Sequence, residues 1–130
     1  MRKTNEINVL ALAYLGDAVY ELYIREYLLN SGLEKAEKLQ KEAVKFVSAK
    51  NQAKVLETLI ENDFFNQEEL SLIFRARNHK GNRHPKNTDI LTYKHSTGFE
   101  AVIGYLHLNE NYNRIKELMN EIFNELKKDK

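Results

Sequence analysis

The sequence contains no cysteine, which excludes disulfide bonds and thiolate metal sites. It has one proline and five glycines in 130 residues, which is unlike a fibrous or disordered chain. Its N-terminal apolar run is broken by Asp17 and Glu21 and lacks a small-residue cleavage site, so we expect neither a membrane span nor a secretion signal. These absences favour a cytoplasmic, globular protein in which residues 1–130 form a single domain.

Net charge is also nearly absent, but the charges are unevenly distributed. The 20 basic and 19 acidic residues give a formal net charge of +1. The segment from Arg75 to His95, however, has six basic side chains against the single acid Asp89, a local charge of +5. Beyond Asn78 it shows no helical period, which predicts a long exposed loop. A solvated surface loop is the ordinary interpretation of a basic run, but this concentration of charge favours an anion-binding element.

Apolar residues recur every three or four positions through most of the chain, which predicts an all-α fold. The first helix is predicted from Ile7 to about Asn30, with Gly32 closing it. Further helices are predicted over 33–47, 48–62, 66–78, 96–108 and 112 to about 128. The predicted N-caps are Ser48, Asn66 and Ser96.

Two acidic residues lie where the helical pattern places apolar ones. Asp17 follows Gly16 in LALAYLGDAVYE, and Glu100 lies in STGFEAVIGYLHL between Gly98 and Gly104. A carboxylate on an apolar face is costly unless it is hydrogen-bonded, paired or metal-bound, and a glycine inside a helix permits close approach of another element. In the first helix alone, a tight helix crossing explains the pattern as well as a functional site does. Its recurrence in a second helix favours a site made by both.

Two carboxylates that face each other from separate helices need a proton or a cation between them. Without thiols, the natural cation is Mg²⁺, with Mn²⁺ as a substitute, and Mg²⁺ typically takes only one or two protein carboxylates. Asp17 and Glu100 are therefore a sufficient protein ligand set, and beside a basic loop they indicate phosphate-ester chemistry. Glu21 is more simply an exposed helix acid, and His107 a packing residue. The histidines that lack the helical pairing of a zinc site are His79, His84 and His95.

These motifs together resemble the ribonuclease III family. LALAYLGDAVYEL is similar to the signature helix of that family, and STGFEAVIGYLHL to its second acidic motif. The resemblance continues through VSAKNQA, RARN and PKNTDILTYKHSTGFEA, so it covers most of the chain. It is closest to the Mini-III ribonucleases of bacteria, which have the catalytic domain without a separate double-stranded-RNA-binding domain, and the short length of the chain agrees.

The resemblance implies an all-α, homodimeric endonuclease that cuts both strands of duplex RNA with Mg²⁺, one strand per active site. It implies a role in ribosomal RNA maturation, on the 23S precursor. The metal-binding acids of the family correspond to Asp17 and Glu100. Longer ribonuclease III enzymes have a glutamate where this chain has Ala13 and an aspartate where it has Thr97. Both departures resemble the Mini-III branch and leave fewer protein ligands for a second metal.

A catalytic domain without an auxiliary module must hold duplex RNA by itself, through the backbone and the wide minor groove. We therefore expect basic side chains of the chain's own surface to contact phosphates. The candidates are Arg75, Arg77, Lys80, Arg83, Lys86 and, more weakly, Lys50.

Two other functions are compatible with the residues. An all-α, Mg²⁺-dependent nucleotide pyrophosphohydrolase would also present carboxylates from packed helices, but it usually needs an E-x-x-E set, which is absent beside Asp17. A non-catalytic helical dimer that binds duplex RNA or the ribosome would bind whether or not Asp17 is present. The tyrosines of the first helix suit either a dimer interface or an intramolecular core: Tyr14, Tyr20 and Tyr23.

Overall fold

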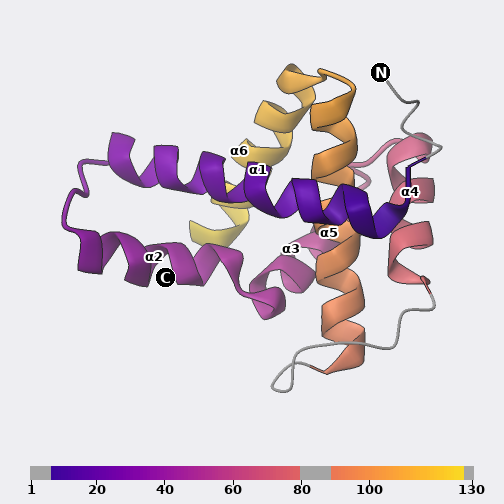
Figure 1. Cartoon of the computed structure of the whole chain (residues 1–130), viewed down its shortest axis with the longest axis horizontal. Coiled ribbons are helices and arrows are strands. Elements are labelled where there is room, and N and C mark those ends of the chain that lie inside the picture. The colour runs from indigo at the N-terminus through magenta and orange to yellow at the C-terminus, as the bar shows by residue number, and fades with distance from the viewer. Residues whose placement is uncertain (1–6, 80–88, 128–130) are drawn as a thin grey trace.

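The computed structural model describes residues 7–79 and 89–127 of the chain. Over these ranges all regular secondary structure is helical, which confirms the prediction of an all-α fold (Figure 1). Within this part of the chain, no helix is long and apolar enough to cross a membrane. The helices are α1 (Val9–Asn30), α2 (Ala36–Val47), α3 (Ala49–Glu61), α4 (Gln67–Arg77), α5 (Ile90–Leu108) and α6 (Tyr112–Lys127).

Several helix ends lie where local side-chain chemistry predicts them. The Ser48 hydroxyl accepts a hydrogen bond from the Asn51 N–H at 3.2 Å and caps α3. Asn66 and Glu69 form the expected capping box at the start of α4. Gly32 follows α1 with a φ of 94°, a conformation that favours glycine over residues with a side chain. These three predicted helix ends are confirmed.

The predicted start of α5 is wrong. Its N-cap is Asp89, whose two carboxylate oxygens accept hydrogen bonds from the backbone N–H and the hydroxyl of Thr92, both at 2.8 Å. The Ser96 hydroxyl instead donates to the carbonyl oxygen of Tyr93 inside the helix. The cap at Asp89 therefore places the start of the helix further upstream, and His95 lies buried in α5 instead of in an exposed loop.

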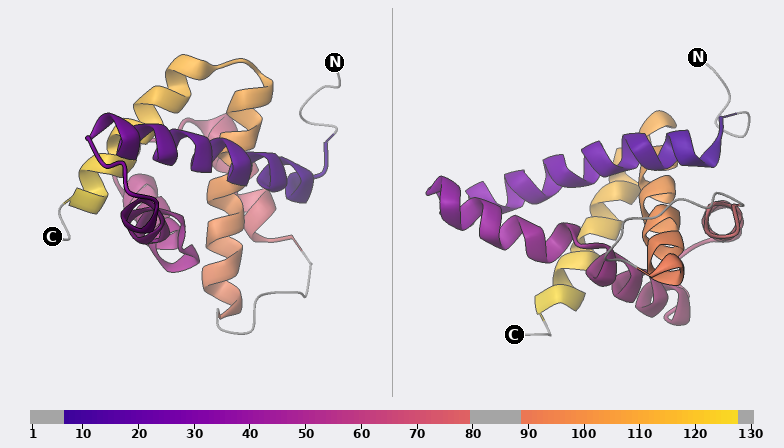
Figure 2. Two further views of the ribbon diagram at one scale, coloured as in Figure 1. Left: turned by 60° about the vertical axis from the view of Figure 1, so that its left-hand side comes forward. Right: turned by 60° about the horizontal axis from the view of Figure 1, so that its bottom comes forward.

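The long helix α5 is the centre of the molecule. It is buried along most of its length, and α1, α3 and α4 all pack against it. In Figure 1, α1 runs across α5, whereas α4 lies beside α5 near the start of α1. The second half of α1 and α2 run side by side as an antiparallel pair, and α6 returns from the end of α5 towards this pair (Figure 2). Residues from all these helices share one hydrophobic core.

The helices α1 and α5 touch backbone to backbone at two glycines. A Cβ atom added to Gly16 would lie 1.7 Å from the carbonyl oxygen of Glu100, and one added to Gly104 would lie 2.0 Å from the carbonyl oxygen of Leu12. Neither position accepts any side chain while the helices remain this close. The sequence-based expectation of a close approach at Gly16 is therefore confirmed, and the contact brings Asp17 next to Glu100.

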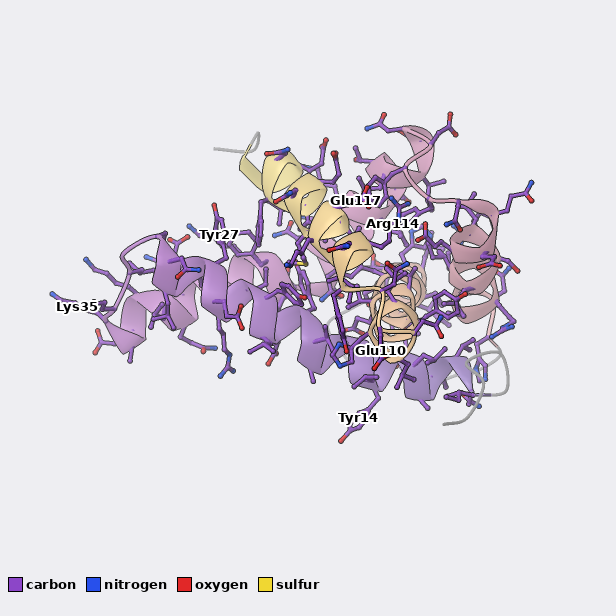
Figure 3. The ribbon with its side chains drawn as sticks, turned by 90° about the horizontal axis from the view of Figure 1, so that it is seen from above. Tyr14, Tyr27, Lys35, Glu110, Arg114 and Glu117 are labelled. Carbon is purple, nitrogen blue, oxygen red and sulfur yellow. The ribbon has the colours of Figure 1, made fainter. Side chains whose placement is uncertain are left out.

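One face of α1 is apolar and exposed, contrary to a simple amphipathic pattern. We call Leu10, Tyr14, Ala18 and Leu22, which are spaced by four residues, the outer stripe of α1. The Tyr14 side chain points away from the ribbon (Figure 3). Tyr14 is 85% exposed and Leu22 is 54% exposed. Tyr20 lies on the opposite side, where its hydroxyl donates to the carbonyl oxygen of Phe46 at 2.9 Å. The tyrosines of α1 therefore divide between the core and the surface.

Candidate active site

Asp17 lies on the exposed edge of α1, directly after Gly16. The buried face of this part of α1 consists of Leu12, Ala13, Gly16, Val19 and Tyr20. Asp17 therefore lies just outside the core. The expectation of a buried acid is wrong for this residue. Its helix does cross α5 tightly, and the crossing also presents its carboxylate to a second acid.

That second acid, Glu100, is half-buried on α5 and hydrogen-bonds to the side chains of Asp17 and Gln52. Burial, followed by the hydrogen bond and the charge of Asp17, raises the pKa of Glu100 to about 8. The charge of Glu21 acts in the same sense, whereas the hydrogen bond from Gln52 opposes the shift. Two carboxyl groups in this arrangement retain a proton near neutral pH unless a cation replaces it.

Gln52 is a member of the site that sequence reasoning missed. Its side chain lies on α3, and the residue is only 3% exposed. Its Nε2 donates to the carbonyl oxygen of Val47 at 3.3 Å, and its amide also hydrogen-bonds to Glu100. The signal was present in the sequence, because Gln52 occupies the same helical face as Val55 and Leu56, where an apolar residue is expected.

The two positions that carry acids in longer ribonuclease III enzymes belong to the core here. Ala13 is buried on α1. Thr97 is buried on α5, and its hydroxyl donates to the carbonyl oxygen of Tyr93 at 2.9 Å. Glu21 is half-buried and pairs with Arg25 at 3.6 Å. Over 7–79 and 89–127, no group of three or more His, Asp or Glu side chains is placed to hold a metal ion.

Arg75 and Arg77 lie in the last turn of α4, where positive charge complements the helix dipole. Arg75 is exposed, and the Arg77 guanidinium lies 5.0 Å from the centre of the Phe74 ring. Lys50 is exposed in the first turn of α3, two positions before Gln52. The remaining predicted phosphate contacts lie outside the described residues: Lys80, Arg83 and Lys86.

The two histidines of α5, His95 and His107, pack against neighbouring side chains. His95 is buried with its Nδ1 3.2 Å from the Glu57 carboxylate, and burial, followed by the charge of Arg77, lowers the pKa of His95. His107 is half-buried and packs edge-on against Tyr112, with 5.6 Å between the ring centroids; its Nδ1 is buried and has no hydrogen-bond partner among the described residues. The prediction of a packing role for His107 is confirmed by this contact. His84 lies outside the described residues.

Comparison with known proteins gives the same picture as the motifs. A model of the ribonuclease III domain matches residues 10–111. The Mini-ribonuclease 3 of Streptococcus pneumoniae is 45% identical over 119 residues, which covers 92% of this chain and 93% of that protein. The Mini-ribonuclease 3 of Staphylococcus aureus is 44% identical over 116 residues, which covers 89% of this chain and 87% of that protein. A crystal structure of a Fusobacterium nucleatum protein covers 92% of this chain and 96% of its own with a TM-score of 0.83 at 32% identity. The chain therefore belongs to the ribonuclease III family, in its Mini-ribonuclease 3 branch.

Proposed function

We propose that this chain cuts double-stranded RNA with Mg²⁺ and that Asp17 and Glu100 are its metal-binding acids. As a member of the ribonuclease III family, it is an endoribonuclease of double-stranded RNA. The observation that carries the assignment of the site is the hydrogen-bonded pair of carboxyl groups at the contact of α1 with α5. Residues from all the described helices share one hydrophobic core, which supports our proposal of a single catalytic domain over residues 1–130.

The donor set of this pair fits a hard divalent cation. Asp17 and Glu100 offer carboxylate oxygens, which Mg²⁺ and Mn²⁺ prefer, and their mutual repulsion is relieved by positive charge. When bound, Mg²⁺ supplies electrostatic stabilisation of the phosphoryl oxygens and lowers the pKa of a coordinated water. Because the pair offers few protein ligands, water and RNA phosphate would supply the remaining ligands. The exposed position of Asp17 leaves this side of the site open to a large substrate.

RNA binding is assigned to basic residues of the surface. Arg75 and Arg77 end α4, and Arg77 is close enough to α5 to perturb His95, five residues before Glu100. Lys50 begins α3, the helix that carries Gln52. We propose that these side chains hold backbone phosphates on either side of the scissile bond, together with the residues outside the described ranges: Lys80, Arg83 and Lys86.

We further propose a homodimer formed through the outer stripe of α1. An isologous interface requires one self-complementary patch, and Leu10, Tyr14, Ala18 and Leu22 supply exposed apolar area on a rigid helix. Asp17 directly precedes Ala18 of the stripe, so pairing two stripes brings one acidic site from each protomer to the same interface. Two sites close together suit cleavage of the two strands of one duplex.

The proposed natural substrate is a duplex region of precursor ribosomal RNA, the 23S precursor in particular, in the cytoplasm. The basis for this assignment is the membership in the Mini-ribonuclease 3 branch. Incubation of the purified protein with precursor 23S RNA and with an unrelated duplex of equal length tests it. Cleavage of the precursor at a defined position is expected, whereas equal and scattered cuts in both RNAs would oppose this assignment.

The experiment that tests the site compares cleavage of a long duplex RNA by wild type, Asp17→Asn and Glu100→Gln with Mg²⁺ present. Binding is measured in parallel by electrophoretic mobility shift. We expect wild type to cut and both variants to bind without cutting. Each substitution removes one carboxylate ligand of the metal and keeps the shape of the side chain. Glu21→Gln is the control. Glu21 is paired with Arg25, so this variant should retain most of the activity.

Two results would contradict the proposal. Binding by wild type without any cleavage would indicate a non-catalytic RNA-binding dimer. Release of pyrophosphate from nucleoside triphosphates, lost in Asp17→Asn, would instead indicate a nucleotide pyrophosphohydrolase.

A further inference from the structure

Gln52 is a buried polar side chain in contact with a proposed metal-binding acid. It lies on α3, whereas Asp17 and Glu100 lie on α1 and α5, so a third helix contributes to the site. A buried side-chain amide is costly unless its polar atoms are hydrogen-bonded. Methionine or leucine would fill the same volume on the apolar face of α3 without this requirement, so packing does not explain the amide.

The side-chain amide of Gln52 has two hydrogen-bond partners. Nε2 donates to the carbonyl oxygen of Val47 at 3.3 Å, and the amide donates to the carboxylate of Glu100. The backbone partner fixes which end of the amide faces Glu100. The hydrogen bond to Glu100 lowers the pKa of that carboxyl group, as expected when the amide donates to the carboxylate.

The acceptor of the first bond is itself held in place. Val47 is the last residue of α2, and the preceding carbonyl oxygen, that of Phe46, accepts the hydroxyl of Tyr20 at 2.9 Å. The Tyr20 ring packs edge-on against Phe99 with 5.0 Å between centroids. The junction of α2 with α3 is thus tied to α1 by Tyr20 and to α5 through Gln52. Tyr20 lies within one helical turn of Asp17, and Gln52 contacts Glu100 itself.

We propose that Gln52 is a positioning residue, which holds the Glu100 carboxylate in the orientation that presents its free oxygen to the divalent cation beside Asp17. This inference rests on the proposed function, because it assigns a role towards the cation of that site. Glutamate has three side-chain torsions, and an unheld carboxylate on α5 would sample several orientations. Hydrogen-bond partners of metal-binding carboxylates typically change metal affinity or activity by about 10–100-fold when removed.

A purely structural role for Gln52 makes a different prediction. If its amide only tied α3 to the end of α2, Tyr20→Phe should have a similar effect, because it removes the neighbouring tie at Phe46 and keeps the ring. If Gln52 positions Glu100, only its own substitution should weaken cation binding. Comparing Tyr20→Phe with a Gln52 variant therefore separates two effects: a weakened junction of α2 with α3, and a loss of the orientation of the Glu100 carboxylate.

The test uses the full chain as wild type, Gln52→Met, Gln52→Asn and Tyr20→Phe. Mn²⁺ binding is measured by electron paramagnetic resonance without RNA, and kcat and KM are measured on duplex RNA with Mg²⁺. Methionine keeps the length of glutamine and removes both donors, while asparagine keeps the amide and falls short of its partners. Asparagine also provides a smaller, polar variant in case methionine prevents folding, and circular dichroism checks each protein.

We expect both Gln52 variants to bind Mn²⁺ about 10–100-fold more weakly, with a matching fall in kcat and an unchanged KM for RNA. Tyr20→Phe should melt at a lower temperature and bind Mn²⁺ like wild type. Unchanged Mn²⁺ affinity and kcat in folded Gln52 variants, or equal losses in Tyr20→Phe, would overturn the positioning role and leave the proposed function standing. Wild type that neither binds Mn²⁺ nor cuts RNA would overturn the proposed function, and the inference with it.

Discussion

Gly16 and Gly104 face each other across the contact of α1 with α5, so closely that a Cβ on Gly16 would lie 2.9 Å from the amide nitrogen of Gly104. The same Cβ would lie 1.7 Å from the carbonyl oxygen of Glu100. Because Asp17 follows Gly16 in the chain, the distance between the two helices sets the distance between the two acids. The glycines therefore determine the geometry of the site without touching a substrate.

Gly104→Ala is expected to force α1 away from α5. Overpacking of a core typically costs about 1–3 kcal/mol, and this contact is with backbone, which cannot rotate aside. A displacement of about 1 Å at a catalytic group can lower the rate roughly 100-fold. We therefore expect the protein that remains folded to cleave RNA much more slowly than wild type. Urea unfolding and single-turnover cleavage at saturating enzyme would measure the two effects.

Gly98→Ala is the matched control on the same helix. Its added Cβ would meet the carbonyl oxygen of Ile73 at 3.2 Å and the Ile73 side chain at 3.3 Å, a contact that a small shift relieves. We expect a smaller loss of stability and near-normal cleavage per folded molecule. Equal loss of cleavage in the two variants would show that the α1–α5 contact has no special part in the site.

Glu100 should make the metal-free protein less stable as the pH rises. Its pKa is about 8 in the folded protein against an ordinary value of 4.5, so between these values the native state holds a proton that the unfolded chain has released. The proton on Glu100 stabilises the native state fully below about pH 4.5. This contribution to the free energy of unfolding, on the order of a few kcal/mol, is lost as the pH rises through 8. Urea unfolding in EDTA at pH 5.5 and 8 would measure it.

Glu100→Gln should remove most of this pH dependence, because glutamine does not titrate. Mg²⁺ should stabilise wild type more at pH 8 than at pH 5.5, since the cation competes with the proton for the same carboxylate. If wild type and Glu100→Gln lose stability in parallel between the two pH values, another group is responsible.

The sequence predicted the helices, most caps and the close approach of another helix beside Asp17, because each depends on neighbouring residues. The capping box of Asn66 and Glu69 and the close approach at Gly16 are of this kind. The role of Gln52 depends on a partner 48 positions away, and periodicity carries no information on such a partner. The start of α5 was misplaced because Ser96 and Asp89 are both acceptable caps, and the hydrogen bonds of Thr92 decide between them.

The exposure of the outer stripe of α1 was also beyond the sequence. Periodicity identifies an apolar face, but it does not say whether that face is covered by the same chain or by another. In α1, apolar residues occur on both sides, so Tyr20 is buried and Tyr14 is exposed. The tertiary arrangement covers one side with α5 and leaves the other open (Figure 3).

Leu22→Asp should convert the proposed dimer into a monomer. A charge in the outer stripe of α1 would have to be desolvated on pairing, which opposes association. Val44→Asp is the control, since Val44 is 49% exposed on α2, comparable with 54% for Leu22, and is not part of the stripe. Sedimentation equilibrium should give a monomer for Leu22→Asp and a dimer for Val44→Asp and wild type. A dimer of Leu22→Asp with the affinity of wild type would place the interface elsewhere.

Neutralising Arg75 and Arg77 together should weaken binding to every duplex RNA and reduce its salt dependence. On duplex DNA, each phosphate contact steepens the slope of log affinity against log salt concentration by about 0.9. The slope of the double glutamine variant should therefore be shallower than that of wild type by about 1–2. Lys41→Gln with Lys116→Gln removes the same charge from exposed positions of α2 and α6. Fluorescence anisotropy across a salt series would compare them, and equal slopes for wild type and the Arg75 and Arg77 variant would refute these contacts.

Arg114 should contribute to stability and not to cleavage. From α6 its Nε and Nη2 donate to the two carboxylate oxygens of Glu69 at 2.9 and 2.8 Å, and Nη2 also donates to the carbonyl oxygen of Phe64 at 2.6 Å. The guanidinium lies 4.1 Å from the centre of the Phe64 ring. The network thus joins the start of α6 to the capping box of α4.

Arg114→Met is expected to lower the free energy of unfolding by about 3–5 kcal/mol, because it leaves the buried carboxylate of Glu69 without its counter-charge. Glu117→Gln is the control: Glu117 is 3.5 Å from the same guanidinium, but its side chain is 64% exposed, so its loss should cost no more than about 1 kcal/mol. Urea unfolding would give both values, with cleavage measured well below the melting temperature. Similar losses in the two variants would mean that burial of Glu69 does not set the strength of this pair. A fall in cleavage by the folded Arg114→Met protein would connect the network to the site on α5.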